Sequence, residues 1–320
     1  MTEQDIITQD FSHHRLSSDK EIGVGDDAAV VVPPNNSRLV VTTDTLNMGV
    51  HFDRNWLPDC IGYKSLAVSL SDLAAMGAQP LWATISLSIP EIDHQWLRKF
   101  SDEFFSLADR YNIKVIGGDL VKGPVSITVQ AIGSVKENTL TRSSAKTGDL
   151  IFVTGQIGDA SLGLKLHNSI SNIPVSPSND EFFRSRLYKP EPRVRVGKQI
   201  VSLANAAIDI SDGLLIDLQR ILTQSNVGAV IDIGNVPVSN ALKRRDKYLE
   251  NWETIILGGE DYELIFTANK KNIENIIAIS KETECPITQI GNIVSNAGVE
   301  LCYEGNLLSI PKNQGFDHFN

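Results

Sequence analysis

Apolar residues recur with two different periods along the first half of the chain. They alternate with polar residues through 83–89 and 125–131, a pattern typical of strands buried on one face. They follow helical spacing after Asp59 and again after Asp93, and either aspartate is placed to cap a helix. Gly77 stands where the first helix should end, because glycine adopts the left-handed conformation of a helix C-terminus. The first half is therefore predicted to be a mixed α/β domain.

Runs of β-branched residues predict three more strands in this half. Two of them, 28–33 and 38–43, are separated by a turn-like Pro-Asn-Asn sequence, and the second ends in Asp44. A short strand at 113–116 runs straight into two glycines that precede Asp119. Glycine lets the backbone turn sharply and approach a ligand closely, so a binding loop is expected there.

The second half also mixes helix and strand patterns. It opens with an apolar run at 150–153 and a helix beginning near Asp159. Later patterns alternate through 207–212, 227–233, 255–267 and 287–294. The segment Asn168 to Asp180 is rich in Ser, Asn and Pro and is expected to be a surface insertion. We therefore predict an α/β fold of the α+β type, with domains at 1–147 and 148–320.

Composition narrows the class of protein. A length of 320 residues fits two domains. No apolar run approaches the roughly 20 residues that span a bilayer, and residues 1–10 are polar and acidic, so we expect a cytoplasmic protein. The formal net charge of -10 argues against binding to nucleic acid, which depends on clustered Lys and Arg. The three cysteines lie far apart, which predicts neither a disulfide framework nor a thiolate zinc site.

Five separate segments carry aspartates at strand ends, in glycine-flanked turns or on a helix face. These aspartates are Asp26, Asp27, Asp44, Asp72, Asp119, Asp209 and Asp212. Ser65, Ser69 and Asp72 are spaced by four and three residues, so they share one helix face. Taken singly, each acid is more simply explained as a turn or cap residue that accepts local N–H groups. Taken together, many oxygen ligands without a His or Cys cluster indicate magnesium and do not support zinc.

Familiar phosphate-binding sequences are absent. The chain has no G-x-x-x-x-G-K-[ST] sequence and no set of protein-kinase loops. Gly23, Gly25 and Ala28 superficially follow a dinucleotide fingerprint, but no apolar strand precedes them. Asp26 and Asp27 would also repel a pyrophosphate. Without a metal ion, this loop is hostile to phosphate.

An ordered set of short sequences runs through nearly the whole chain. In order they are GVGDDAAV, VTTDTLNMGVHF, SLSDLAAMGAQP, VIGGD, LTRSSAKTGD, AIDISDGLLIDL, LGGEDYEL and GFDHF. Each is weak alone, but the full series from Gly23 to Phe319 is specific. It resembles the thiamine-monophosphate kinase family, within the ATP-dependent superfamily that includes aminoimidazole ribonucleotide synthetase and selenophosphate synthetase.

The resemblance implies a two-domain α/β homodimer with the N-terminal sheet at its interface, which uses ATP and several Mg²⁺ ions. It implies transfer of the γ-phosphate of ATP to thiamine monophosphate, the last step of thiamine diphosphate biosynthesis. By motif position, the metal ligands are Asp27, Thr42, Thr43, Asp44, Asp72, Asp119, Asp209 and Asp212. The implied nucleotide contacts are Gly118, Arg142 and Ser211. The implied substrate contacts are His51, Glu260 and Phe316. Asp44, Asp119 and Asp212 are the implied catalytic residues.

The chemistry of such a transfer agrees with these residue types. A phosphate monoester has a second pKa of about 6, so the acceptor oxygen is largely ionised at neutral pH and needs no general base. Two highly anionic groups must instead be neutralised and held in line. The thiazolium of thiamine is a permanent cation, which suits an aromatic face such as Phe316 and a carboxylate such as Glu260.

Two alternatives stand beside this interpretation. Another enzyme of the superfamily would keep the ATP and metal residues and change the acceptor. Selenophosphate synthetases typically carry a reactive Cys or selenocysteine near the N-terminus, whereas no Cys precedes Cys60; hydrogenase-maturation relatives typically end in Cys, whereas this sequence ends in Asn320. A binding module that retains the fold without turnover is the second alternative. The complete set of aspartates disfavours it, and production of ADP would exclude it.

Overall fold

The structure is a computed structural model that describes residues 3–12, 14, 16, 21–168, 176–243 and 252–310. The chain divides into two compact units, each of them mixed α/β as the sequence predicts. The first unit comprises Met1–Leu73 and Ala78–Glu137, and the second comprises Ala74–Gly77 and Asn138–Asn320. Residues 138–147, which we predicted to close the first domain, thus lie with the second unit. Within the described residues, no helix is both long and apolar enough to cross a bilayer.

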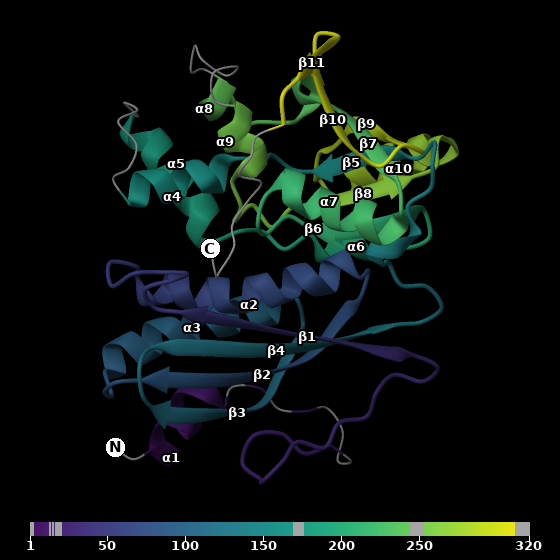
Figure 1. Cartoon of the computed structure of the whole chain (residues 1–320). Helices are drawn as coiled ribbons and strands as arrows, with labels where there is room; N and C mark the ends of the chain where they lie inside the picture. Colours follow the sequence, from purple (N-terminus) through teal and green to yellow (C-terminus); the bar gives the residue numbers. More distant parts are fainter. Residues whose placement is uncertain are drawn as a thin grey trace. The chain divides into compact units, whose positions relative to one another are not determined.

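The first unit is built on a four-stranded sheet with two long helices on one face (Figure 1). Its elements are α1 (Glu3–Ile6), the π-helical turn η1 (Ile7–Phe11), β1 (Arg38–Asn47), α2 (Pro58–Ala75), β2 (Gln79–Ile89), α3 (His94–Arg110), β3 (Lys114–Lys122) and β4 (Ser126–Val135). The strand order is β1-β4-β2-β3. Strand β4 is antiparallel to both β1 and β2, while β3 is parallel to β2.

The two helices form where the apolar spacing predicts them. The Asp93 carboxylate caps α3 by accepting hydrogen bonds from the N–H groups of Gln95 at 2.9 Å and Trp96 at 3.1 Å. Asp59 is not the cap of α2 but lies in its first turn, because Pro58 already occupies a helical position. A Cβ on Gly62 would lie 2.2 Å from the carbonyl oxygen of Phe100, so only glycine permits this approach of α2 to α3.

Strands β1 and β3 run further than predicted. Asp44 and Asp119 therefore lie inside strands and not at strand ends or in turns. The two glycines before Asp119 serve the sheet: a Cβ on Gly118 would lie 1.9 Å from the carbonyl oxygen of Ile85 on β2. Glycine is needed at this position for close strand packing, and the predicted turn is wrong.

The predicted strand at 28–33 is also wrong. Among the described residues, its only ladder contact is an isolated bridge in which Ile22 and Val30 exchange hydrogen bonds of 2.8 and 2.9 Å. Pro33 and Pro34 have no N–H to donate, so a ladder cannot continue past Val32. The β-branched composition of this segment therefore reflects an extended chain rather than a sheet strand.

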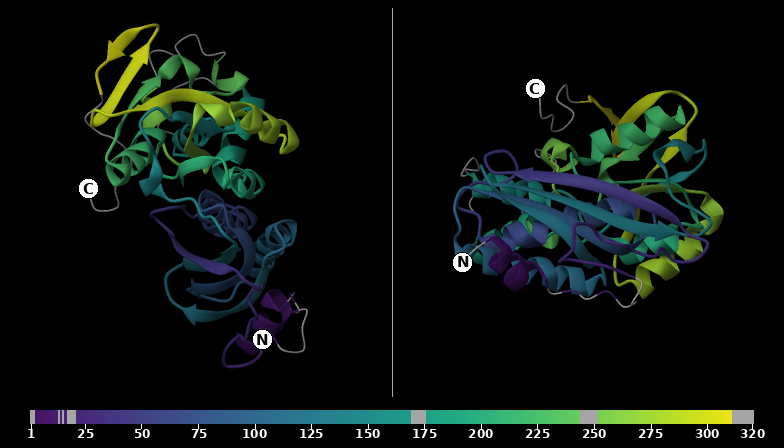
Figure 2. Two further views of the ribbon diagram at one scale, coloured as in Figure 1. Left: turned by 90° about the vertical axis from the view of Figure 1, so that its right-hand side faces the viewer. Right: turned by 90° about the horizontal axis from the view of Figure 1, so that it is seen from below.

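The second unit contains a seven-stranded mixed sheet with helices packed against it. Its elements are the 3₁₀ turn η2 (Arg142–Ser144), β5 (Leu150–Thr154), α4 (Asp159–His167), α5 (Pro177–Tyr188), α6 (Val194–Ile200), β6 (Ala204–Asp209), α7 (Leu214–Ser225), β7 (Gly228–Asp232), η3 (Ile233–Asn235), α8 (Asn240–Lys243), α9 (Trp252–Leu257), β8 (Leu264–Ala268), η4 (Lys270–Asn272), α10 (Ile273–Glu282), β9 (Ile287–Val294), β10 (Gly298–Tyr303) and β11 (Asn306–Leu308). The strand order is β11-β10-β7-β9-β5-β8-β6, with the β10–β11 hairpin at one edge (Figure 2).

Both faces of this sheet are buried. Ile151 and Val153 of β5 belong to the same hydrophobic core as Leu218 and Ile221 of α7. Phe152 points to the other face, where its ring stacks on Phe266 of β8 at a centroid distance of 5.3 Å. The continuous apolar run that predicted β5 is explained by this two-sided burial.

Part of the predicted surface insertion is helical. Residues 169–175 lie outside the described residues, but α5 begins at Pro177. The Ser176 hydroxyl caps it by accepting a hydrogen bond from the N–H of Asn179 at 3.3 Å. Serine followed by proline resembles a loop in composition, yet it is also a favourable helix start, because proline at the first helical position has no N–H to leave unsatisfied.

Candidate functional site

Strand β1 and helix α2 bring three of the predicted metal ligands together, namely Thr42, Asp44 and Asp72. Thr42 and Asp44 share one face of β1, since alternate strand residues point the same way. The Thr42 hydroxyl donates a short hydrogen bond to Asp72 of α2, and the Ser69 hydroxyl donates to Oδ2 of Asp44 at 2.8 Å. Thr42, Asp44, Ser69 and Asp72, which the sequence singles out, thus form one cluster. We call its two carboxylates the Asp44–Asp72 pair.

Negative charge accumulates in this pair. The pKa of Asp44 is raised to about 6, chiefly by burial and also by repulsion from the Asp72 carboxylate, while the hydrogen bond from Ser69 opposes both effects. The Asp72 carboxylate is thus close enough to disfavour the ionisation of Asp44. A divalent cation with hard oxygen preference would relieve this repulsion.

Two neighbours of the pair are placed differently from it. The Ser65 hydroxyl donates to the carbonyl oxygen of Gly62 at 2.9 Å, within its own helix. The Thr43 side chain is exposed on the opposite face of β1. The structure therefore does not bring Ser65 or the Thr43 side chain to Asp44, and the assignment of Thr43 as a metal ligand stays a prediction.

Asp27 and Asp119 line a second region of the same unit. They contribute with Gly118 to a cavity of ≈ 580 Å³ between β3 and the N-terminal segment. Asp26 also lines it and accepts a hydrogen bond from the N–H of Asp27 at 2.9 Å. Asp119 pairs with Ser86 of β2, on the sheet face opposite Asp44. The predicted ligands of this unit are thus divided between two faces of one sheet.

His51 lies in the turn that follows β1. The ring atom Nδ1 accepts a hydrogen bond from the backbone N–H of Asn47 at 3.0 Å, and the backbone N–H of His51 donates to the carbonyl oxygen of Asn47 at 3.0 Å. Because Nδ1 is an acceptor, the proton of the neutral ring is on Nε2. The turn therefore fixes His51 in the tautomer that presents an N–H donor at Nε2.

In the second unit, Asp209, Ser211 and Asp212 lie at the end of β6 and in the loop that leads to α7. The buried Asp217 carboxylate holds this loop, because its Oδ2 accepts N–H groups from Ser211 at 3.1 Å, Asp212 at 3.0 Å and Gly213 at 3.2 Å. Burial raises the pKa of Asp217 to about 6, and the Arg220 guanidinium opposes that rise. Arg220 contacts both carboxylates, at 2.5 Å to Oδ1 of Asp217 and 2.6 Å to Oδ2 of Asp212.

Backbone hydrogen bonds join the loop before β8 to the loop after β6. The N–H of Glu260 donates to the carbonyl oxygen of Ser211, and the N–H of Tyr262 donates to that of Ile210, each at 2.8 Å. A Cβ on Gly259 would lie 2.2 Å from the Ser211 carbonyl oxygen. Glu260 has a φ of 78°, a left-handed conformation that is unfavourable for a residue with a side chain. Two predicted site residues, Ser211 and Glu260, are thus brought together by backbone contacts.

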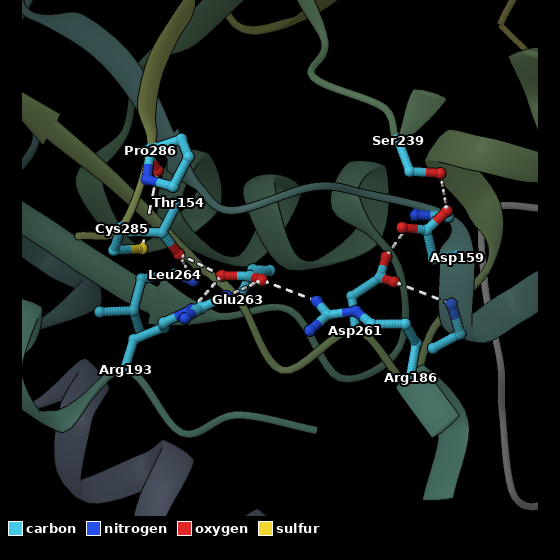
Figure 3. Close-up of polar contacts among 12 residues, drawn as sticks. Thr154, Asp159, Arg186, Arg193, Ser239, Asp261, Glu263, Leu264, Cys285 and Pro286 are labelled. Atoms are coloured by element: carbon cyan, nitrogen blue, oxygen red, sulfur yellow. Dashed lines mark hydrogen bonds and ion pairs between the residues drawn. The ribbon is translucent and has the colours of Figure 1, made fainter. Parts of the chain in front are cut away.

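The same loop is anchored by a buried ion-pair network around Glu263 (Figure 3). Arg193 binds the carboxylate with two nitrogens, at 2.5 and 2.6 Å, and Arg186 adds a contact at 3.0 Å. The Thr154 hydroxyl donates a further hydrogen bond at 2.7 Å. Burial alone would raise the pKa of Glu263, but Arg193 and Arg186 hold it below its usual value. Glu263 is therefore ionised and fully compensated.

Two more buried acids stand beside this network (Figure 3). Asp261 accepts hydrogen bonds from the N–H groups of Gly158 at 2.8 Å and Ala160 at 3.4 Å, at the start of α4. Asp159 accepts a hydrogen bond from the Ser239 hydroxyl at 2.6 Å. Burial raises the pKa of Asp261 to about 8 and that of Asp159 to about 6. At neutral pH, Asp261 is therefore largely protonated.

Arg142 is exposed in η2, and its carbonyl oxygen accepts a hydrogen bond from Ser225 at 2.7 Å. Phe316 lies outside the described residues.

Sequence reasoning missed Asp217, Arg220 and Glu263 as site-forming residues. The signal for Asp217 and Glu263 was present, since both fall inside the sequences AIDISDGLLIDL and LGGEDYEL.

The donor set fits magnesium better than a metal held by protein alone. Across the described residues, no group of three or more His, Cys, Asp or Glu side chains is arranged to hold a metal ion. The Asp44–Asp72 pair, with Thr42 and Ser69 beside it, instead offers two carboxylates and hydroxyl oxygens. Magnesium suits such a partial site, because it keeps several waters and takes its remaining ligands from substrate phosphates.

Known protein families and solved structures match this chain over nearly its whole length. Residues 25–135 match the family model of AIR synthase related protein, N-terminal domain, and residues 146–303 match that of the C-terminal domain. The thiamine-monophosphate kinase of Buchnera aphidicola subsp. Acyrthosiphon pisum is 42% identical over 100% of this chain and 99% of its own length. The crystal structure of thiamine-monophosphate kinase from Stenotrophomonas maltophilia K279a has a TM-score of 0.84 at 40% identity, covering 95% of this chain and 96% of that one. AaThiL complexed with AMPPCP and TMP has a TM-score of 0.77 at 33% identity, covering 92% of each chain.

Proposed function

The chain belongs to the thiamine-monophosphate kinase family, and from that premise we propose that it transfers the γ-phosphate of ATP to thiamine monophosphate, forming thiamine diphosphate and ADP. This reaction is the last step of thiamine diphosphate biosynthesis. The observation that carries the proposal is the Asp44–Asp72 pair, where two like charges face each other in a partly buried site. A kinase needs such a place for the metal that accompanies ATP.

The proposed metal is Mg²⁺, with more than one ion in the catalytic state. When bound, Mg²⁺ neutralises the charge of the phosphates and aligns them for transfer. Asp44 and Asp72 would hold it in the first unit, with Thr42 fixing the Asp72 carboxylate and Ser69 fixing that of Asp44. The further proposed metal ligands are Asp27, Thr42, Thr43, Asp119, Asp209 and Asp212.

The transfer itself is proposed to be direct and in line. An oxygen of the thiamine monophosphate phosphate attacks the γ-phosphorus, and the bond from that phosphorus to the bridging oxygen of ADP breaks. The acceptor phosphate has a second pKa of about 6, so at neutral pH it attacks as a dianion and no side chain has to remove a proton. The chain's own contribution is therefore positioning and charge neutralisation.

The remaining site residues are proposed to bind the two substrates. Gly118, Arg142 and Ser211 would contact the nucleotide, and Arg142 suits a phosphate because its planar guanidinium donates two parallel hydrogen bonds. Glu260 and Phe316 would face the cationic thiazolium and the flat pyrimidine. His51 would donate to the acceptor phosphate from Nε2, a role that the hydrogen bond at its Nδ1 supports.

We propose a homodimer formed through the outer face of the first sheet. Leu39 and Val41 on that face are 47% and 56% exposed, which is unusual for strand residues of a sheet whose other face is packed. Val41→Glu should shift the protein to a monomer in light scattering, whereas an unchanged mass would contradict this interface. We also propose that the enzyme acts in the cytoplasm, where ATP and Mg²⁺ are supplied together.

Product analysis tests the proposed reaction. Purified protein would be incubated with ATP, Mg²⁺ and thiamine monophosphate, and the products separated by chromatography and identified by phosphorus NMR. Thiamine diphosphate and ADP should form in equal amounts, and free thiamine in place of the monophosphate serves as the control acceptor. Release of ADP without thiamine diphosphate would reject the acceptor. Retention of ATP without any turnover would reject the kinase assignment in favour of a binding module.

A further inference from the structure

Arg220 links the candidate metal ligand Asp212 to the buried scaffold acid Asp217. Its Nη1 lies 2.5 Å from Oδ1 of Asp217, and its Nη2 lies 2.6 Å from Oδ2 of Asp212. The guanidinium is planar and presents its donors in a fixed fork, so one arginine can serve two carboxylates at once. The side chain of Asp212 is 26% exposed and that of Arg220 is 37% exposed, so solvent and ions reach this contact.

The two halves of this bridge have different surroundings. Asp217 is buried and its other oxygen accepts three backbone N–H groups, so its position is set by the loop as well as by Arg220. The side chain of Asp212 has Arg220 as its ion-pair partner, and unlike Asp217 it is partly exposed to solvent. The contact with Asp212 is therefore the one that can open without disturbing the loop.

We propose that Arg220 is a positioning residue that pairs with Asp212 in the metal-free enzyme and yields this carboxylate to Mg²⁺ while keeping its contact with Asp217. The inference rests on the proposed function, since it takes Asp212 as a magnesium ligand. Arg220 then has two effects. It keeps Asp212 oriented and neutralised before the metal binds, and it competes with the metal for the same oxygen.

Competition sets the direction of the expected effect. An ion pair between partly exposed groups lowers the affinity of a competing cation by about two- to five-fold. Replacing Arg220 with methionine keeps the apolar stem and removes the competing charge. Arg220→Met should therefore bind Mg²⁺ about two- to five-fold more tightly than the wild type. Arg220→Lys keeps the charge but lacks the fork, so its affinity should lie between those two.

The test is a calorimetric titration of the full chain with Mg²⁺, without ATP or acceptor. Wild type, Arg220→Met, Arg220→Lys, Asp212→Asn and the double variant Arg220→Met/Asp212→Asn would be compared, with thermal unfolding to confirm that each is folded. The gain from Arg220→Met should vanish when Asp212 is already Asn, because the two residues act on one oxygen. Arg220→Lys gives an independent reading if the methionine variant does not fold.

Unchanged or weaker Mg²⁺ binding in a folded Arg220→Met would overturn the proposal. A gain that persists in the double variant would also overturn it, since Arg220 would then act elsewhere. The titration contains neither substrate, so its result is separate from the formation of thiamine diphosphate, which tests the proposed function on its own.

Discussion

Carboxylates in the two units are balanced by different partners. In the first unit, Asp44 faces the carboxylate of Asp72, and hydroxyl groups of Ser69 and Thr42 are the donors to the pair. In the second unit, Glu263 is bound by Arg193 and Arg186 at distances of 2.5 to 3.0 Å. Like charges are brought together in one place, and opposite charges in the other.

This difference distinguishes a candidate binding site, the Asp44–Asp72 pair, from a structural ion-pair network, the one around Glu263. A buried acid that already has two arginines gains little from a further cation, so the Glu263 network is suited to hold the loop that carries Glu260. Hydroxyl donors orient a carboxylate without cancelling its charge. The Asp44–Asp72 pair therefore keeps the capacity to bind a divalent ion. Removing one charge from each region should affect different properties of the protein.

Glu263→Gln should give the largest loss of stability. The substitution leaves Arg193 and Arg186 buried without their carboxylate, and breaking a buried pair in this way costs about 3–5 kcal/mol. Chemical denaturation would measure the loss in the free energy of unfolding. Glu181→Gln on the exposed face of α5 is the matched control and should change it by less than about 0.5 kcal/mol. Equal effects of the two substitutions would mean that the Glu263 network does not stabilise the fold.

Asp44→Asn should abolish most activity while leaving the fold intact. The amide has the same shape, but it offers no negative charge to a metal, and loss of one such group lowers kcat by about 100- to 1,000-fold. Initial rates of ADP formation would measure the change. Stability should stay the same or rise, because the amide removes the repulsion with Asp72. A variant that unfolds would place Asp44 with the scaffold acids.

Asp261 should make stability depend on pH. In the folded protein its pKa is raised from the ordinary aspartate value of 3.8 to about 8, so between these values the folded state holds a proton that the unfolded state has lost. Stability from this group is complete below about pH 4 and falls as pH rises to about 8, by up to about 1.4 kcal/mol per pH unit. Asp261→Asn should flatten this part of the profile in urea unfolding. Parallel profiles would mean that Asp261 is already ionised at neutral pH.

Asp93→Ala should have the smallest effect. It removes the side-chain cap of α3, which costs about 1 kcal/mol. The melting temperature should fall by a few degrees, and kcat should stay at the wild-type value because the cap lies outside every proposed contact. A fall in kcat without a fall in melting temperature would reveal a role for the α3 N-terminus that the cap does not explain.

Local patterns were sufficient for most elements of the fold. Strand β9 lies at 287–294 as its apolar pattern indicates, and Asp93 caps α3. Strand ends were less predictable, since Asp44 and Asp119 lie within strands whose polar residues face an open sheet surface or a polar cluster. Polarity alone made these residues resemble the ends of strands.

The partners of the site residues were not predictable from the sequence. Glu263 is 70 residues from Arg193 and 77 from Arg186, and neither periodicity nor turn chemistry reports contacts of that separation. Arg220 lies eight residues from Asp212, yet the pairing depends on the sharp loop that Asp217 holds. The sequence indicated which acids matter, and only the packing of the chain showed which of them are neutralised by arginine.

The proposed function requires the Asp44–Asp72 pair to bind the metal that accompanies ATP. The most direct test is the melting temperature of wild type and Asp44→Asn with a non-hydrolysable ATP analogue, with and without Mg²⁺. A ligand that binds only the folded state raises its stability. Mg²⁺ should raise the melting temperature of the wild type by several degrees and that of the variant by much less. An equal rise in both proteins would contradict the assignment of this pair as the metal site.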